Sequence, residues 1–190
     1  PYYTTRFFTG MRSSEIDGLK WENVDFDRRE IKIRSAIVDG IEGPTKTYGS
    51  NREIVMSQLV YDALQEQKRY TFGKSDYVFC NSQGKPLEHR NVNRRIWTPT
   101  LALLGIKHRR AYQTRHTAAT LWLAAGENPE WIAKQMGHSS TEMLFRVYSR
   151  YVPDMTRQDG SAMDSLLLAS KQLASEKNND KQDNAKKDND

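Results

Sequence analysis

Residues 112–151 read YQTRHTAATLWLAAGENPEWIAKQMGHSSTEMLFRVYSRY, and this stretch predicts three successive helices. The apolar spacing of residues 114–125 favours a helix that ends at the following glycine. Asn128-Pro129 is typical of a helix start, because asparagine can cap the first turn and proline fits its first position. Gly137 then ends the second helix, and a third follows the serine pair. The stretch therefore indicates a domain that is helical in its C-terminal part.

Four side chains in and around this stretch are suited to phosphate chemistry. His138 precedes Tyr148 by ten residues, Arg115 lies in the first helix, and Arg12 stands far upstream in FTGMRSSEI. Attack on a phosphodiester needs a nucleophile, fixed positive donors for the oxygens that gain charge, and an acid for the leaving oxygen. The planar guanidinium matches two phosphate oxygens. We therefore expect Arg12 and Arg115 to hold a phosphate that Tyr148 attacks, with no obligatory metal ion or other cofactor.

Upstream of this stretch the pattern changes from helical to strand-like. Residues 30–38 alternate apolar and polar side chains, and Asp39-Gly40 is a hairpin signal. Second and third strands are expected at residues 43–46 and 52–56, which together predict a small three-stranded antiparallel sheet. Further helices are expected at residues 11–19, 59–67, 91–104 with an interruption near Pro99, and 163–173. The expected fold class is α+β, mainly α.

The length and the charge of the chain limit which classes of protein it can belong to. The 190 residues fit one domain with a tail, and no stretch has the roughly 18 consecutive apolar residues of a membrane span. Of the net charge of +5, residues 158–190 contribute −2 through five lysines and seven acidic residues, so the remainder carries +7. A basic body of this kind suits a polyanionic partner, although a merely basic surface gives the same count. The single Cys80 suits a reducing cytoplasm.

The expected organisation has three parts. Residues 1–157 form the main body, residues 158–176 hold a C-terminal helix, and residues 177–190 are a polar, disordered tail. The start of the chain, PYYTTRFFTG, is typical of the end of a packed helix. We therefore expect the chain to begin inside a longer protein.

The chain resembles the tyrosine recombinases, the phage-type integrase family, in several segments that follow the family's order and spacing between residues 7 and 153. The segments with their matching residues are FTGMRSSEIDGLKWENVDF with Arg12 and Glu15, PTKTYGSNREI with Lys46, TRHTAATLWLAAG with Arg115, QMGHSS with His138, and FRVYSRYVP with Tyr148.

The resemblance implies a role for each matched residue. Arg12 and Arg115 clamp the scissile phosphate, and Lys46, on a hairpin, protonates the 5′ leaving oxygen. His138 hydrogen-bonds the phosphate or assists proton transfer, and Tyr148 becomes joined to the 3′-phosphate. The family acts as a homo-tetramer on two DNA duplexes that carry attachment sites, whereas an isolated catalytic part can be a monomer. The resemblance also implies that residues 1–157 are the catalytic domain and that the family's N-terminal DNA-binding domain is not within these residues. The helix at residues 162–173, within the segment 158–176, is a candidate for exchange between subunits.

One position departs from the family's pattern. The family has a histidine three residues before its second arginine, where this chain has Tyr112. A phenol ordinarily titrates near pH 10 and is a poor base at neutral pH, whereas an imidazole near 6.5 is well suited. Tyr112 can still hydrogen-bond the phosphate. Removal of the Tyr148 proton would then depend on His138, water or the substrate.

Several assignments keep a competitor. Tyr151 lies three residues after Tyr148 and faces a similar side of a continuing helix. Lys68 and Lys74 are alternatives to Lys46, and Glu15 serves either to orient Arg12 or in the chemistry itself. By their patterns, His116 is expected to support the helix beside Arg115, and the tryptophans belong to the core.

A basic stretch precedes the second arginine segment. Next to a phosphate site it is expected to follow the DNA backbone, which predicts a steep salt dependence of DNA binding. Its members are Arg90, Arg94, Arg95, Lys107, Arg109 and Arg110.

These observations predict a site-specific recombinase, the integrase of a prophage or integrative element. Two alternatives remain at this point. A type IB topoisomerase uses the same phosphotyrosine chemistry without exchanging strands, and a DNA-binding regulator could keep an inactive site.

Overall fold

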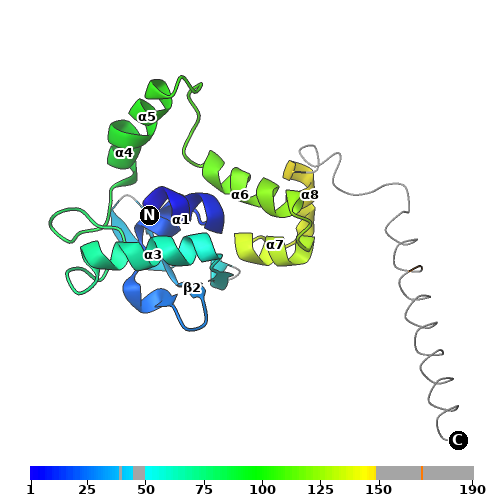
Figure 1. The fold of residues 1–190 in the computed structure, drawn as a ribbon, viewed down its shortest axis with the longest axis horizontal. Helices are drawn as coiled ribbons and strands as arrows, with labels where there is room; N and C mark the ends of the chain where they lie inside the picture. The colour runs from blue at the N-terminus through cyan, green and yellow to red at the C-terminus, as the bar shows by residue number, and fades with distance from the viewer. Residues whose placement is uncertain (39, 45–49, 149–167, 169–190) are drawn as a thin grey trace, which may run out of the picture. The chain divides into compact units, whose positions relative to one another are not determined.

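The computed structural model describes residues 1–38, 40–44, 50–148 and 168. Its elements are mainly helical, with short antiparallel strands between the second and third α-helices (Figure 1). The helical elements are α1 (Tyr2–Thr9), α2 (Ser13–Asp17), η1 (Trp21–Asn23), α3 (Gln58–Thr71), α4 (His89–Val92), η3 (Asn93–Trp97), α5 (Thr98–Leu103), α6 (Gln113–Ala124), α7 (Pro129–Met136) and α8 (Thr141–Tyr148). The strands are β1 (Val24–Asp25), β2 (Glu30–Ile33), β3 (Ser35–Val38), β4 (Ile41–Pro44) and β5 (Arg52–Val55).

Several expectations fall outside the described residues. They concern Asp39, Lys46, Tyr151, the helix at residues 163–173 within the 158–176 segment, and the 177–190 tail. Within the described residues, none of the helices combines the length and the apolar character that crossing a membrane requires.

The strands differ from the expected single sheet. β2 pairs with β5 and also with β1, which the sequence reading missed, while β3 and β4 form a separate hairpin. The expected strand at residues 30–38 is divided at Arg34. Ile31 and Ile33 are buried, but the next buried side chain is Ala36, so the inward alternation slips by one residue. Because of this slip, the two halves of the expected strand belong to different sheets.

The first core lies between the sheet and the helices before it and after it. Ile31 of β2 faces Ile54 of β5 in the ladder, and both are fully buried. α3 begins at the cap Ser57 and covers this layer with Val60 and Leu64. α1 packs against both α3 and α6. It therefore connects the sheet side of the molecule to the C-terminal helices.

The basic helix at residues 91–104 is not interrupted at Pro99. Instead α4, η3 and α5 follow one another with helical backbone angles at their junctions, and the five residues of η3 form a π-helical turn (Figure 1). Proline has no N–H and its ring clashes with the carbonyl four residues earlier. A wider turn just before Pro99 accommodates this clash without ending the helix.

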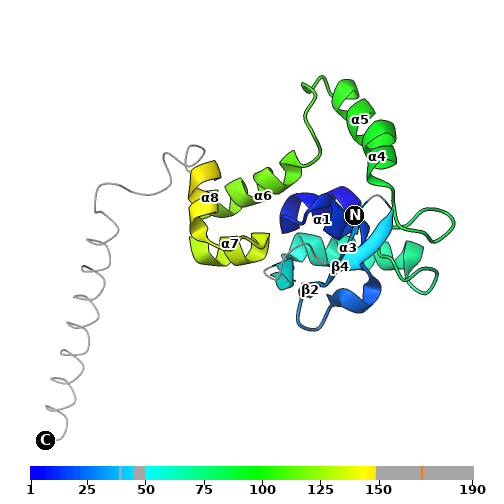
Figure 2. The same ribbon diagram turned by 180° about the vertical axis from the view of Figure 1, so that it is seen from behind.

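α6, α7 and α8 pack against one another and lie together in both views (Figures 1 and 2). Their shared core contains Ala119, Ile132, Met136 and Leu144. The expected signals are confirmed for α7: the Asn128 side chain accepts two backbone N–H groups, and the helix ends at a left-handed glycine. This bundle holds the C-terminal residues of the predicted site.

Candidate active site

A helix was expected over residues 11–19, but Arg12 lies just before the helix and not inside it. Its extended backbone makes it the N-cap of α2. The Arg12 backbone N–H donates to Oε2 of Glu15 at 2.7 Å, and its Nη1 donates to Oε1 at 2.7 Å. Its Nη2 donates to the carbonyl of Gly137 at 3.1 Å. About a third of the side chain (32 %) stays exposed, so the fixed guanidinium still faces solvent.

Glu15 is held by a second arginine that the sequence reading missed. Arg52 of β5 donates to Oε1 and Oε2 of Glu15 at 2.9 and 2.8 Å, and both side chains are buried. Arg52 also donates to the carbonyl of Gln135 at 2.7 Å. Burial alone would raise the Glu15 pKa, but the hydrogen bonds and charge of Arg52, together with Arg12, lower it to about 2. Glu15 is therefore an ionised link between Arg12 and β5.

Arg115 projects from α6 into the interior beside Arg12. Its guanidinium donates to the carbonyls of Gly10 and Met136, and only 2 % of the residue is exposed. Burial lowers the Arg115 pKa to about 10, and the neighbouring charge of Arg12 contributes to that shift. The carbonyl partners come from the turns after α1 and at the end of α7. The fold thus holds the guanidinium in place from two sides.

His138 follows α7 and faces the same cluster of guanidiniums. Burial and the charges of Arg115, Arg12 and Arg52 lower its pKa to about 4, so the imidazole is neutral at pH 7. Its buried Nδ1 has no hydrogen-bond partner among the residues that the structure describes. His138 also lines a pocket of about 460 Å³, with both serines that follow it. A phosphate oxygen would supply the partner that the ring lacks.

Tyr148 lies at the end of α8 with 2 % of its surface exposed. Its phenolic oxygen lies 2.8 Å from Nδ1 of His116, a residue of α6. Burial raises the Tyr148 pKa to about 12, although the charge of Arg115 acts in the opposite direction. Burial, aided by Arg115, lowers the pKa of His116. The phenol is therefore protonated and the imidazole neutral at pH 7.

Tyr112 stands at the N-terminal end of α6 and is 44 % exposed. Its ring meets the His116 ring edge to face, with the centroids 5.3 Å apart. The His116 ring in turn meets the Tyr148 ring at 5.5 Å. The three rings form a continuous row from the surface to the buried phenol.

The structure therefore brings together Arg12, Glu15, Arg115, His138 and Tyr148, with Tyr112 at the edge of the group. Lys46 lies outside the described residues. The basic stretch is divided: Arg90, Arg94 and Arg95 are exposed on α4 and η3, while Arg109 and Arg110 are exposed in the loop before α6. Sequence reasoning gave His116 only a supporting place and passed over Arg52. Both lie inside matched segments, TRHTAATLWLAAG and PTKTYGSNREI, but their three-dimensional partners are 32 and 37 residues away.

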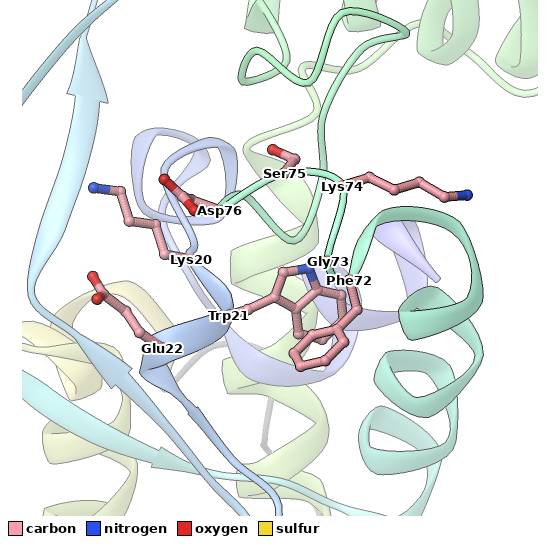
Figure 3. Close-up of a pocket in the computed structure, with 8 residues that line it drawn as sticks. All are labelled: Lys20, Trp21, Glu22, Phe72, Gly73, Lys74, Ser75 and Asp76. Carbon is pink, nitrogen blue, oxygen red and sulfur yellow. The ribbon is translucent and has the colours of Figure 1, made fainter.

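A second pocket of about 470 Å³ lies away from this cluster. It is lined by residues of η1 and of the loop after α3, and the rings of Trp21 and Phe72 form its apolar part (Figure 3). Lys20 and Lys74 point in different directions there (Figure 3). None of the predicted catalytic residues lines this pocket. Nor do the described residues contain a group of three or more His, Cys, Asp or Glu side chains placed to hold a metal ion.

A model of the phage integrase family matches residues 6–153. The chain belongs to the phage integrase family. The family expected from the five segments is thereby confirmed. The match runs from α1 past the end of α8, so it includes every element that contributes to the cluster.

Relatives include integrases and tyrosine recombinases. Prophage integrase IntR of Escherichia coli (strain K12) is 30 % identical over 185 residues, covering 84 % of this chain and 45 % of the relative. The integrase of Staphylococcus phage L54a is 26 % identical over 175 residues, covering 84 % and 49 %. The chain thus spans about half the length of the curated relatives that it matches.

Solved structures confirm the fold class. The Tn1549 transposon integrase in complex with circular intermediate DNA matches with a TM-score of 0.70 at 23 % identity, covering 87 % of this chain and 58 % of that one. XerA recombinase matches with a TM-score of 0.63 at 20 % identity, covering 87 % and 56 %. These likenesses establish a tyrosine-recombinase type of catalytic-domain fold.

Proposed function

We propose that this chain is the catalytic part, nominally residues 1–157, of a site-specific recombinase that cuts and rejoins double-stranded DNA through a 3′-phosphotyrosine at Tyr148. One observation carries the proposal. A buried phenol, a neutral imidazole and two fixed guanidiniums meet where α6, α7 and α8 pack together. These groups match the demands of phosphodiester transesterification, namely a nucleophile and preorganised positive charge.

The exposure of the two arginines indicates how they would divide the work of binding the phosphate. Arg12 is the more exposed guanidinium and would bind a non-bridging oxygen directly, while Arg115 lies deeper and adds positive potential behind it. His138 would donate to the phosphate from a neutral ring. Lys46 is assigned to protonate the 5′ oxygen on the resemblance alone. Because Tyr148 is 2 % exposed, the groups that cover its phenol must move before phosphorus can reach it.

The wider biology is proposed from the relatives. An integrase of a prophage or other integrative element would act on attachment sites in the cytoplasm. Solved relatives include lambda integrase as a dimer bound to a core site. We propose double-stranded DNA as the partner of this chain and a homo-tetramer as the assembly that completes strand exchange. The exposed arginines of α4, η3 and the loop before α6 would follow the DNA backbone.

A nicked suicide duplex tests the chemistry. The short strand beyond the cut diffuses away, so a covalent protein–DNA adduct accumulates and appears on a denaturing gel. We expect an adduct with the wild-type chain and none with Tyr148→Phe. An adduct that survives Tyr148→Phe would move the nucleophile to Tyr151, and its complete absence in the wild type would favour the regulator with an inactive site.

A pair of activity assays tests the reaction class. Incubation with two attachment-site duplexes measures strand exchange, and incubation with supercoiled plasmid measures relaxation. We expect exchanged products. Relaxation without exchange would indicate a type IB topoisomerase instead.

A further inference from the structure

The structure offers an answer to the question that Tyr112 raises. If the usual histidine position holds a phenol, another group must take the proton of the nucleophile. The hydrogen bond between His116 and Tyr148 already joins an imidazole to that phenol at 2.8 Å. It connects two helices across 32 residues of sequence and lies inside the packed bundle. The contact is therefore built into the fold.

The charges around His116 determine the direction of this hydrogen bond. Arg115 is its neighbour on α6, Tyr112 and Tyr148 touch its ring, and Arg109 lines the same pocket. Among the elements packed against α6, His138 interacts electrostatically with His116, and Arg6 of α1 donates to Thr114. The other charged side chains of α7 and α8 are exposed, namely Glu130, Lys134, Glu142 and Arg146. Burial and Arg115 keep the His116 ring neutral, and burial keeps Tyr148 protonated. The phenol therefore donates, and Nδ1 accepts.

We propose that His116 is the catalytic base that takes the phenolic proton of Tyr148 during DNA cleavage. This inference depends on the proposed function, because it assigns one step of that same reaction. General bases must lie within hydrogen-bond reach of the proton that they remove, and His116 meets this condition in the absence of DNA. The ordinary imidazole pKa also lies close to neutral pH.

The step is balanced in atoms and charge. The Tyr148 oxygen forms its bond to phosphorus while the bond from phosphorus to the 5′ oxygen breaks. The phenolic proton passes to Nδ1 of His116, which becomes an imidazolium. The 5′ oxygen takes a proton from a separate acid, for which the proposed function names Lys46. In the rejoining step the 5′ hydroxyl attacks phosphorus and gives its proton back to that acid, while the phenolate leaves and takes its proton from His116.

Two features of the site support this exchange of a proton. The incoming phosphate is an anion, so its charge offsets the repulsion between Arg115 and a newly formed imidazolium. His116 also lines an open pocket of about 500 Å³ together with Arg109, Gln113 and Thr120. The ring can therefore exchange protons with water between turnovers. His138 is less suited to be the base, because three guanidiniums surround it.

Single-turnover cleavage of the nicked duplex by the full chain tests the inference. We expect His116→Gln, whose amide can hydrogen-bond but cannot take a proton, to slow adduct formation by about 10²- to 10⁴-fold. DNA affinity should change by less than about twofold, as measured by fluorescence anisotropy. The matched control is His108→Gln, which removes an exposed imidazole before α6 and should keep the wild-type rate.

A sulfur substitution separates a base from an acid. A duplex with sulfur in place of the bridging 5′ oxygen has a leaving group that needs no proton. Such a substrate should restore the rate of a variant that lacks the acid, and it should leave His116→Gln slow. The slow rate of His116→Gln should instead rise with pH, because hydroxide replaces the missing base.

The outcomes distinguish the two proposals. A wild-type chain that forms no adduct, or forms it on another tyrosine, overturns the proposed function. A wild-type adduct on Tyr148 with an equally fast His116→Gln overturns the role of His116 alone, as does full recovery of that variant on the sulfur substrate. If His116→Gln and His116→Asn do not fold, the wild-type pH profile decides: the rate should fall from pH 8 to pH 5, and a flat profile overturns the inference.

Discussion

Glu15 is the residue on which the positions of two arginines depend. Its carboxylate binds Arg12, which faces solvent, and Arg52, which is buried and fastens β5 to the end of α7. Removing one partner of a buried ion pair leaves the other charged and without compensation. The network therefore affects both the stability of the fold and the geometry of the phosphate site.

Arg52→Ala should lower the free energy of unfolding by about 3–5 kcal/mol, because it leaves the Glu15 carboxylate buried with only Arg12 as a partner. Urea denaturation followed by circular dichroism measures the loss. The matched control is Arg34→Ala, which removes an ion pair to Glu53 whose side chains are 41 and 42 % exposed. That loss should be about 0–1 kcal/mol. Equal losses in the two variants would contradict the account.

His138 should make stability depend on pH. Its folded pKa of about 4 lies below the ordinary value of 6.5, so the fold favours the neutral ring. The resulting stabilisation is complete above pH 6.5 and is lost as the pH falls towards 4. Between pH 7.5 and 4.5, the wild-type chain should therefore lose more of its urea stability than His138→Gln does. Equal losses would show that His138 is not held neutral.

At the scale of residues, the sequence predicts the side chains that carry the chemistry better than it predicts the side chains that position them. Arg12, Arg115, His138 and Tyr148 each stand in a recognisable segment, and the structure gathers them. Arg52 and His116 act through partners 37 and 32 residues away, and no local pattern encodes such a distance. Lys46 has a segment of its own, and its assignment stays a prediction.

At the scale of elements, the ends of helices do most to form the site. The carbonyls of Gly10 and Met136, at the ends of α1 and α7, hold Arg115, and that of Gly137 accepts from Arg12. Gly137 has a φ of 65°, and a Cβ there would lie 3.1 Å from Nη1 of Arg52. A helix end is thus packed directly against the guanidinium network.

Gly137→Ala should destabilise the chain more than Gly126→Ala. Both glycines have left-handed backbone angles, and an alanine in that conformation lowers the free energy of unfolding by about 1–2 kcal/mol at either position. At Gly126 a Cβ would meet nothing within 4 Å, whereas at Gly137 it would also displace Arg52. Thermal unfolding compares the two variants, and the adduct assay should show slower cleavage only for Gly137→Ala. A larger loss at Gly126 would refute this account.

Helix signals translated into structure more directly than strand signals. Asn128, Pro129 and Gly137 fixed α7 because caps are local interactions. The alternation over residues 30–38 was real, but it could not indicate that the pattern would slip at Arg34 or that β1 would pair with β2. Strand partners are non-local, so a single chain pattern leaves them open. The wide turn before Pro99 is similarly a compromise that propensity alone does not reveal.

At the scale of the whole molecule, positive charge is concentrated outside the C-terminal segment. Residues 1–157 carry a net charge of +7, and the exposed arginines of residues 90–110 lie on α4 and η3 and in the loop before α6. Arg109 lines the pocket beside His116, so this charge borders the catalytic cluster. A duplex that reaches Arg12 would therefore be expected to cover it.

Replacing both Arg94 and Arg95 with glutamine should weaken DNA binding and lower its salt dependence. Each phosphate contact contributes about −0.9 to the slope of log affinity against log salt concentration, so the slope should become less steep by about 1.8. Fluorescence anisotropy with a labelled duplex across a salt series measures it. Arg28 and Arg69 are also exposed but lie outside the basic stretch, and their double replacement removes the same charge. If the two double variants change the slope equally, net charge alone governs binding. A change confined to Arg94 and Arg95 identifies η3, which carries both residues, as a part that follows the DNA backbone.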